Sequence, residues 1–208
     1  MIRSSSNRET DKGPLLIVLS GPSGAGKDAI LARMKELGCH LERVVTVTTR
    51  PPRSNERNHI DYHFVSPSAF QEMLARGEFL EWAKVYGNFY GVPRQSLKKA
   101  LEKGDSVIKV DVQGVATLKK VLPEAIYIFL SPPSLRELGE RLQGRQTESP
   151  EELARRLKTA GDEIKQLPLF DYIVFNRPDA IDQAIAGIRA IVTAEKSRVK
   201  PRRVNLDF

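Results

Sequence analysis

The sequence predicts an α/β fold, in which a parallel β-sheet flanked by helices forms a core that is interrupted by two insertions. Residues 15–20 (LLIVLS) have the length and apolar character of a fully buried strand, and a glycine-rich turn and an amphipathic helix follow them directly. From residue 43 to residue 90 short β-branched and aromatic runs follow one another without crossover helices, which indicates a small mixed lobe. Alternating strands and helices then return, apart from a helical segment near residues 135–165.

The core is expected to begin with a strand–turn–helix unit. Ile30, Met34 and Leu37 would share one face of its helix, and Gly38 is placed to end that helix because glycine readily adopts the left-handed conformation found there. Further core elements are expected as strands over residues 107–112, 126–130 and 172–175 and as helices over residues 114–122 and 178–196.

Each insertion has its own pattern. The first is expected to hold strands over residues 44–48, 61–65 and 78–82 and a short helix with Ser66 as N-cap, Pro67 at its first position and Gly77 at its end. The second is expected to hold a helix over residues 136–143 and a longer helix that starts at the capping box of Ser149. Apolar residues at positions 153, 157, 160, 164 and 167 give that longer helix one apolar stripe.

Composition places the chain among globular proteins with one large domain. Of its 208 residues 40% are hydrophobic and 28% charged, and no apolar run approaches the ~18 residues that cross a bilayer. Residues 1–13 are polar and lack the apolar centre of a signal peptide, so they are expected to be a disordered lead-in. A single cysteine, Cys39, excludes an internal disulfide and fits the reducing conditions of the cytoplasm.

The net charge of +7 suits a protein that binds polyanions, either nucleotides or nucleic acids. Part of that charge comes from the basic tail over residues 197–208. No groove-reading motif or base-stacking platform accompanies the tail, so no specific nucleic-acid partner is expected. Three histidines and one cysteine do not form the pattern of a structural zinc site.

A phosphate-binding loop is predicted directly after the first strand. It consists of Gly21, Pro22, Ser23, Gly24, Ala25, Gly26, Lys27 and Asp28, which match the P-loop pattern at every position except the last. Its glycines let backbone N–H groups converge on phosphate oxygens, and Lys27 would reach the β- and γ-phosphates. The alternative is a plain strand–helix connection, but the loop follows a buried strand, opens a helix and carries the lysine. The core is therefore expected to be a nucleotide-binding domain of the P-loop NTPase type.

Two arginines are expected to converge on one anion. Pro51 and Pro52 hold the segment extended, with about three residues per turn, so the side chains of Arg50 and Arg53 would point the same way. Two guanidinium groups offer forked donors to a phosphate. Taken alone, a solvated basic turn explains the segment equally well.

Carboxylates and further arginines complete the candidate set. Glu81 stands in a largely apolar run, where it could accept two parallel N–H bonds from the edge of a bound base, with a salt-bridged glutamate on an edge strand as the simpler alternative. Asp111 follows a predicted parallel strand, at the sheet edge where α/β proteins collect ligands. Arg141, Arg145 and Arg156 could stabilise the charge of a transferring phosphoryl group, with solvated helix faces as the alternative.

Together these segments resemble the guanylate kinases. The P-loop, residues 49–53, 61–65, 78–91, 111–114 and 141–148, and Arg156 occur in the order and at the spacing of that family, over essentially residues 15–192. The resemblance implies a core domain over residues 14–45, 93–134 and 166–196, a small mixed GMP-binding lobe over residues 46–92 and a helical lid over residues 135–165. It also implies a cytoplasmic enzyme with ATP and GMP as substrates, Mg²⁺ as the cofactor of ATP and no membrane partner, and it leaves the oligomeric state open.

The resemblance also assigns roles to single residues. In the GMP site, Arg50, Arg53, Tyr62 and Tyr90 would hold the phosphate, Glu81 and Thr46 would read guanine, and Asp111 would lie beside the nucleotide. In catalysis and ATP binding, Lys27, Arg50, Arg141, Arg145 and Arg156 would serve the phosphates and the transition state, and Asn176 would lie near the adenine. A rival interpretation is an inert binding module of the kind found in membrane scaffolds. Such modules typically lose the P-loop lysine and the lid arginines, which this chain retains.

Five positions depart from the family pattern. They are Asp28 in place of Ser or Thr, Val92 in place of a hydroxyl residue, Lys109 in place of an acid, Gln146 in place of Gly and Arg177 in place of Asp. Asp28 has the largest consequence, because the usual hydroxyl meets Mg²⁺. We expect Asp28 to serve Mg²⁺ directly or through a water, with Asp111 ordering the same hydration shell. The alternative is that Asp28 caps the helix or pairs with a nearby base such as Lys27.

Overall fold

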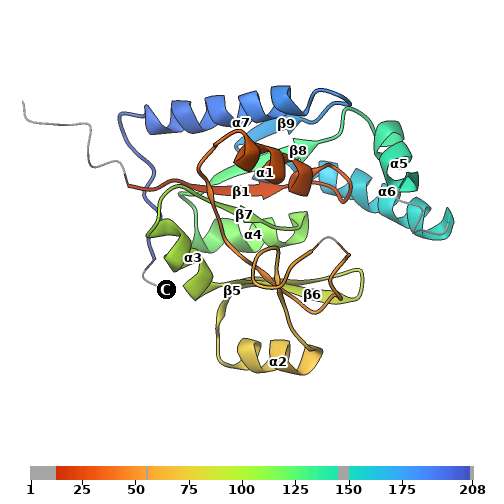
Figure 1. Cartoon of the computed structure of the whole chain (residues 1–208), viewed down its shortest axis with the longest axis horizontal. Helices are drawn as coiled ribbons and strands as arrows, with labels where there is room; N and C mark the ends of the chain where they lie inside the picture. Colours follow the sequence, from red (N-terminus) through yellow and green to blue (C-terminus); the bar gives the residue numbers. More distant parts are fainter. Residues whose placement is uncertain (1–12, 55, 145–149, 207–208) are drawn as a thin grey trace, which may run out of the picture.

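The computed structural model describes residues 13–54, 56–144 and 150–206. Its larger sheet has five parallel strands in the order β2-β7-β1-β8-β9, with the predicted first strand at the centre (Figure 1). The strands are β1 (Leu16–Ser20), β2 (Glu42–Arg43), β7 (Ser106–Lys109), β8 (Ile126–Ser131) and β9 (Tyr172–Phe175). The predicted α/β fold with a parallel sheet is therefore confirmed.

Helices cover both faces of this sheet (Figure 1). They are α1 (Lys27–Glu36) and α7 (Ile181–Lys196) on one face and α3 (Arg94–Leu101) and α4 (Val112–Val121) on the other. Because successive strand residues point to opposite faces, Ile17 packs with Ile30 of α1 and Ile185 of α7, whereas Val18 packs with Leu118 of α4. The apolar run of β1 thus serves two separate clusters of buried side chains.

A second, four-stranded mixed sheet lies below the first in the view of Figure 1, in the order β4-β3-β6-β5. Its elements are β3 (Val47–Thr48), β4 (His63–Phe64), β5 (Phe79–Val85), β6 (Asn88–Pro93) and the helix α2 (Pro67–Ala75). Ser66 caps α2 as predicted, since its Oγ accepts a hydrogen bond from the backbone N–H of Ala69 at 3.1 Å. Aromatic rings of Phe70 and Phe79, stacked with centroids 4.6 Å apart, fill the space between α2 and the sheet.

Two expectations for this lobe were wrong in detail. The run over residues 44–48 is not one strand: β2 ends at Arg43 in the large sheet, β3 begins at Val47 in the small one, and the chain crosses between the sheets in the intervening residues. The strand β6 was not foreseen, because Gly91 and Pro93 interrupt its alternating pattern. The helix α3, which follows it directly, was not foreseen either. Pro93, which has no N–H to donate, is tolerated as the last residue of β6, and Gly91 leaves room for Phe79, since a Cβ there would lie 2.6 Å from Phe79 Cδ1.

The helical segment consists of α5 (Leu135–Gln143) and α6 (Pro150–Ile164). Leu138 and Leu142 of α5 pack with Ala160 of α6, as the apolar stripe predicts. The stripe ends earlier than expected, because Leu167 lies in a short 3₁₀ helix (Leu167–Leu169) that Pro168 helps to start. The capping residue Ser149 and the departure Gln146 lie outside the described residues.

Several helix ends differ from the expectation by one to three residues. Leu37 follows the last residue of α1 and is 43% exposed, so it does not share the buried face of Ile30 and Met34. The helix α7 begins at Ile181 rather than at residue 178. No helix in the described ranges is both long and apolar enough to cross a membrane.

The chain after α7 is packed rather than solvated where the structure describes it. Val204 and Leu206 lie against the cluster under α3 and α4. Arg202 donates from Nε to Glu195 Oε2 at 3.0 Å and from a terminal guanidinium nitrogen to the backbone oxygen of Ala125 at 3.1 Å. Part of the basic tail therefore has a structural role.

Candidate nucleotide-binding cleft

One cleft of about 380 Å³ lies between the P-loop, the small sheet, the end of β7 and α6. It collects most of the predicted site residues, namely Ser23, Gly24, Gly26, Lys27, Asp28, Thr46, Arg50, Arg53, Tyr62, Glu81, Tyr90, Asp111 and Arg156. Five other predicted residues do not line it: Gly21, Pro22, Ala25, Arg141 and Asn176. Arg145 lies outside the described residues.

The P-loop adopts a conformation that only glycine permits at its first position. Gly21 has a φ of 140°, and a Cβ there would lie 2.1 Å from the backbone oxygen of Leu130. Lys27 folds back over the loop, where its Nζ donates to the backbone oxygens of Gly21 at 2.5 Å and Pro22 at 3.0 Å. Burial lowers the pKa of Lys27, while the carboxylates of Asp111 and Glu163 oppose that effect.

Asn176 and Arg141 brace the P-loop from behind instead of facing the cleft. The Asn176 side chain is buried and donates from Nδ2 to the backbone oxygen of Ala25 at 2.8 Å. Arg141 in turn donates to the backbone oxygen of Asn176 at 2.7 Å and to Glu137 Oε1 at 2.6 Å. These contacts link α5 to the loop through the end of β9.

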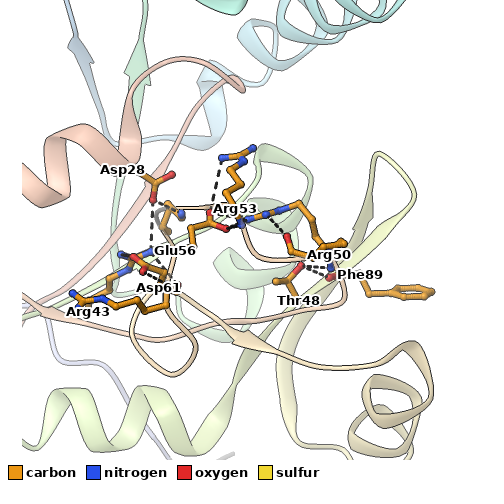
Figure 2. Close-up of polar contacts among 11 residues, drawn as sticks. Asp28, Arg43, Thr48, Arg50, Arg53, Glu56, Asp61 and Phe89 are labelled. Carbon is orange, nitrogen blue, oxygen red and sulfur yellow. Dashed lines mark hydrogen bonds and ion pairs between the residues drawn. The ribbon is translucent and has the colours of Figure 1, made fainter. Parts of the chain in front are cut away.

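Arg50 and Arg53 both contact the carboxylate of Glu56, Arg50 through its guanidinium and Arg53 by a hydrogen bond from its backbone N–H (Figure 2). The Arg53 guanidinium lies 3.9 Å from Glu56 Oε1, and convergence of the two side chains on a phosphate stays a prediction. One terminal guanidinium nitrogen of Arg50 donates to both Glu56 oxygens, at 2.8 and 2.9 Å, and the backbone N–H of Arg53 donates to Oε2 at 2.8 Å. Burial acts to raise the pKa of Glu56, but the hydrogen bonds from the two arginines outweigh it and hold that pKa below its usual value. Sequence reasoning missed Glu56, which stands three residues after Arg53.

Two tyrosines adjoin the arginine pair. The Arg50 guanidinium lies 5.6 Å from the ring centroid of Tyr62, and Tyr62 meets Tyr90 edge-on at 6.2 Å. Burial raises the pKa of Tyr62 to about 12, so its phenol stays protonated. This wall of the cleft thus offers guanidinium and hydroxyl donors close together.

Glu81 is a buried carboxylate on β5. Glu81 is 5% exposed, and burial together with the nearby charge of Asp111 raises the pKa of its carboxyl to about 7. Thr46 and Val92 beside it in the cleft are also buried. Gly114 in α4 leaves room for it, since a Cβ there would lie 2.4 Å from Glu81 Oε1. This supporting glycine was not recognised from the sequence.

The helix α6 brings an arginine to the cleft and carries a buried carboxylate that does not line it. Arg156 donates to Ser23 Oγ of the P-loop at 3.5 Å, and its guanidinium lies 5.2 Å from the ring centroid of Tyr86. Glu163 on the same helix is 6% exposed, and burial together with Asp111 raises its pKa to about 7, while Lys27 opposes that rise. Glu163 was also missed, because it lies beside the apolar stripe without belonging to it.

Asp28 and Asp111 both occupy the start of a helix. Asp28 accepts a hydrogen bond from Lys109 and lies 3.6 Å from Arg43, so it pairs with bases other than the suggested Lys27. Asp111 caps α4, because its Oδ1 accepts from the backbone N–H of Gln113 at 3.1 Å. Among the residues that the structure describes, no three His, Cys, Asp or Glu side chains gather as metal ligands.

Comparisons with known proteins agree on one family. The guanylate kinase family model matches residues 14–195. A guanylate kinase of Caldanaerobacter subterraneus subsp. tengcongensis is 44% identical over 189 residues, which cover 90% of this chain and 91% of that protein. Guanylate kinase 2, chloroplastic/mitochondrial, of Oryza sativa subsp. japonica is 42% identical and aligns with 93% of this chain and 68% of its own length. The crystal structure of guanylate kinase from Anaplasma phagocytophilum has a TM-score of 0.70 at 34% identity, and the match covers 90% of this chain and 88% of that one.

The parallel sheet, the loop after its central strand and the cleft shared with a smaller sheet define a nucleotide-binding enzyme of the P-loop class. The family match and the similarity to these relatives make the assignment more specific. The chain belongs to the guanylate kinase family and is a nucleoside monophosphate kinase.

Proposed function

We propose that this protein transfers the γ-phosphoryl group of ATP to GMP, and to dGMP, to give ADP and GDP or dGDP. The observation that carries the proposal is that a single cleft joins the P-loop to a buried carboxylate and to a pair of arginines. A donor triphosphate and an acceptor monophosphate can therefore approach each other from opposite walls. Single-cysteine composition suits an enzyme that works in the cytoplasm.

GMP would bind along the small sheet. Guanine offers an N1–H and a 2-amino group, and the two oxygens of Glu81 would accept both, with Thr46 beside them. The GMP phosphate would lie against Arg50 and Arg53 and against the hydroxyls of Tyr62 and Tyr90, all of which line the cleft. Glu56 holds both arginines together at this wall, and Asp111 would lie beside the bound nucleotide.

ATP would bind across the P-loop, with Lys27 released from the loop carbonyls to meet the β- and γ-phosphates. The acceptor phosphate oxygen is anionic at neutral pH, so the reaction needs no strong general base. Positioning and charge stabilisation dominate phosphoryl transfer, and Arg156, which already lies against Ser23, is placed to supply the latter. Arg145 and Arg141 would contribute from the same segment, Arg141 chiefly by fixing the loop. Asn176 would support the adenine side through the same loop.

The cleft also fits a Mg²⁺ ion that arrives with ATP. Asp28 and Asp111 supply the carboxylate oxygens that Mg²⁺ prefers, and both contacts of Asp28 with its basic partners use Oδ1. When bound, the ion would neutralise part of the negative charge of ATP. Asp28 would hold it directly or through a water, with Asp111 ordering the same hydration shell.

Incubation of the purified protein with ATP and GMP, followed by chromatographic separation of the nucleotides, tests the proposal. Equal amounts of ADP and GDP are expected. Formation of ADP and inorganic phosphate without GDP would contradict it, because that result describes an ATPase.

Asp28→Asn is expected to raise the Mg²⁺ concentration that gives half-maximal activity by about tenfold, because a neutral amide is a weaker partner for a hydrated cation. The affinity for ATP without metal should change little. The measurement is a Mg²⁺ titration of the initial rate at fixed ATP, with Asp162→Asn, an exposed acid on α6, as the control. An unchanged titration would remove the metal role from Asp28.

The affinity for GMP is expected to weaken as the pH falls through 7. Glu81 has a pKa of about 7 in the free protein, and only its ionised form accepts two N–H bonds from guanine. Binding should therefore be strongest above pH 8 and about tenfold weaker at pH 6, where about nine in ten Glu81 side chains are protonated. Calorimetric titrations with GMP across this range check the prediction. Glu81→Gln is the control, because the GMP phosphate still ionises in its presence whereas residue 81 no longer does. The same pH dependence in this variant would overturn the assignment of Glu81 as the group that binds guanine.

A further inference from the structure

Two charged side chains that are far apart in the sequence meet at the wall of the cleft. Lys109, the last residue of β7, donates a hydrogen bond from Nζ to Oδ1 of Asp28 in the first turn of α1. The Asp28 carboxylate also lies 3.6 Å from the guanidinium of Arg43, on the neighbouring strand β2 (Figure 2). One carboxylate is thus held by cations from two adjacent strands.

The two partners differ in exposure. The Lys109 side chain is 8% exposed, whereas that of Asp28 is 61% exposed and opens onto the cleft. The Lys109 ammonium lies 4.5 Å from the ring centroid of Tyr62, which covers it from the side of the small sheet. Among the described residues, Asp28 is the only carboxylate within ion-pair distance of this ammonium. Both residues line the cleft, but the lysine side chain is buried whereas the aspartate side chain is largely exposed.

An unpaired carboxylate at this position would oppose ATP. Asp28 directly follows the P-loop lysine, so its negative charge lies next to the place of a triphosphate, where like charges repel. The positive end of the α1 dipole suits a carboxylate, but it gives only a partial charge. The ammonium of Lys109 carries a full positive charge and is held in place by burial. It therefore offsets the repulsion between Asp28 and the phosphates more completely than the helix dipole does.

We propose that Lys109 is a positioning residue of the ATP site, which acts through Asp28 by holding its carboxylate at the end of β7 and offsetting its charge. The inference rests on the proposed function only in placing the ATP phosphates at the P-loop. It differs from a direct role, in which the Lys109 ammonium would itself bind phosphate. Although Lys109 lines the cleft, its side chain is buried and its ammonium is already engaged by Asp28 and the Tyr62 ring, which favours the indirect role.

A double-mutant cycle separates these two roles. The affinity for metal-free ATP, in the presence of a chelator, is measured by calorimetry for the wild type, Lys109→Met, Asp28→Asn and the double variant. Lys109→Met is expected to weaken ATP about tenfold when Asp28 is present and less than about twofold when residue 28 is asparagine. Equal weakening in both backgrounds would show a direct phosphate contact, and no weakening in either would show that the pair does not matter for ATP; both results overturn the proposal.

A matched control is available in Lys119. Its Nζ lies 5.0 Å from the ring centroid of Tyr127 and 3.6 Å from Asp171 Oδ1, and it does not line the cleft. Lys119→Met should lower the thermal stability as Lys109→Met does but leave the ATP affinity within about twofold of the wild type. If Lys109→Met does not fold, Lys109→Gln enters the same cycle with the same expected dependence on Asp28.

A conservative variant adds a second readout. Lys109→Arg keeps the charge and the partner, so its ATP affinity is expected within about threefold of the wild type. A loss as large as that of Lys109→Met would contradict charge compensation. Wild-type GMP phosphorylation is assayed separately. If the proposed function is wrong, no GDP forms in that assay. If this inference is wrong, the effects of the Lys109 and Asp28 substitutions on ATP affinity are additive.

Discussion

Replacing Glu81 by glutamine is expected to lower kcat/KM for GMP by about a hundredfold or more while ATP binding stays nearly intact. The glutamine keeps the size of the side chain but offers one acceptor and one amide donor where guanine presents two donors. Because the site is buried, one of the two facing N–H groups would be left without a partner. Steady-state kinetics with GMP varied at saturating ATP give the ratio.

Glu78→Gln is the matched control for this prediction. Glu78 lies one residue before β5 and pairs with Arg76 outside the cleft, at 2.5 Å between Nε and Oε1. Its replacement should leave kcat/KM for GMP within about twofold of the wild type. Comparable losses in the two variants would mean that Glu81 acts through the stability of the lobe and not through the base.

Arg156→Ala is expected to lower kcat by about a thousandfold and to change KM for GMP little. Its guanidinium already lies at the P-loop, and an arginine that reaches the transferring group stabilises charge that develops only in the transition state. Arg53→Ala should do the opposite and raise KM for GMP by about tenfold with a smaller effect on kcat, because under the proposed function Arg53 would contact the GMP phosphate already in the ground state. Initial-rate kinetics of the two variants separate these effects, and exchanged phenotypes would overturn the assignment of both arginines.

The parts of the site that could be predicted from the sequence are those encoded locally. The P-loop is a continuous run between a buried strand and a helix, so its conformation follows from neighbouring residues. Arg50 and Arg53 were expected to converge because two prolines restrict the segment between them. The helix α2 was predicted at both ends, since a cap and a proline mark its start and a glycine its end.

The parts that could not be predicted depend on contacts between distant segments. Nothing near Asp28 in the sequence indicates Lys109, which is 81 residues away and reaches it only because β7 lies beside β1 in the sheet. Gly114 is an ordinary helix position until the packing of α4 against β5 brings Glu81 against it. Glu163 becomes buried only when α6 lies against the core. Such contacts follow from the order of strands and the placement of helices, which local patterns do not specify.

Asn176 shows how a residue chosen from the sequence can differ in its observed contact. Its position in the chain suggested the adenine pocket, whereas its side chain is buried and bonded to the backbone of the P-loop. A role near adenine stays a prediction.

The most direct test of the account is the acceptor preference of the wild-type protein. Values of kcat/KM are measured for GMP, dGMP, AMP, CMP and UMP with saturating ATP and Mg²⁺ in one coupled assay. The account predicts that GMP is preferred over AMP by about 10⁴, because adenine lacks both donors that Glu81 accepts and would leave its buried carboxylate unpaired. Efficient phosphorylation of AMP would contradict the assignment of Glu81 as the group that recognises guanine.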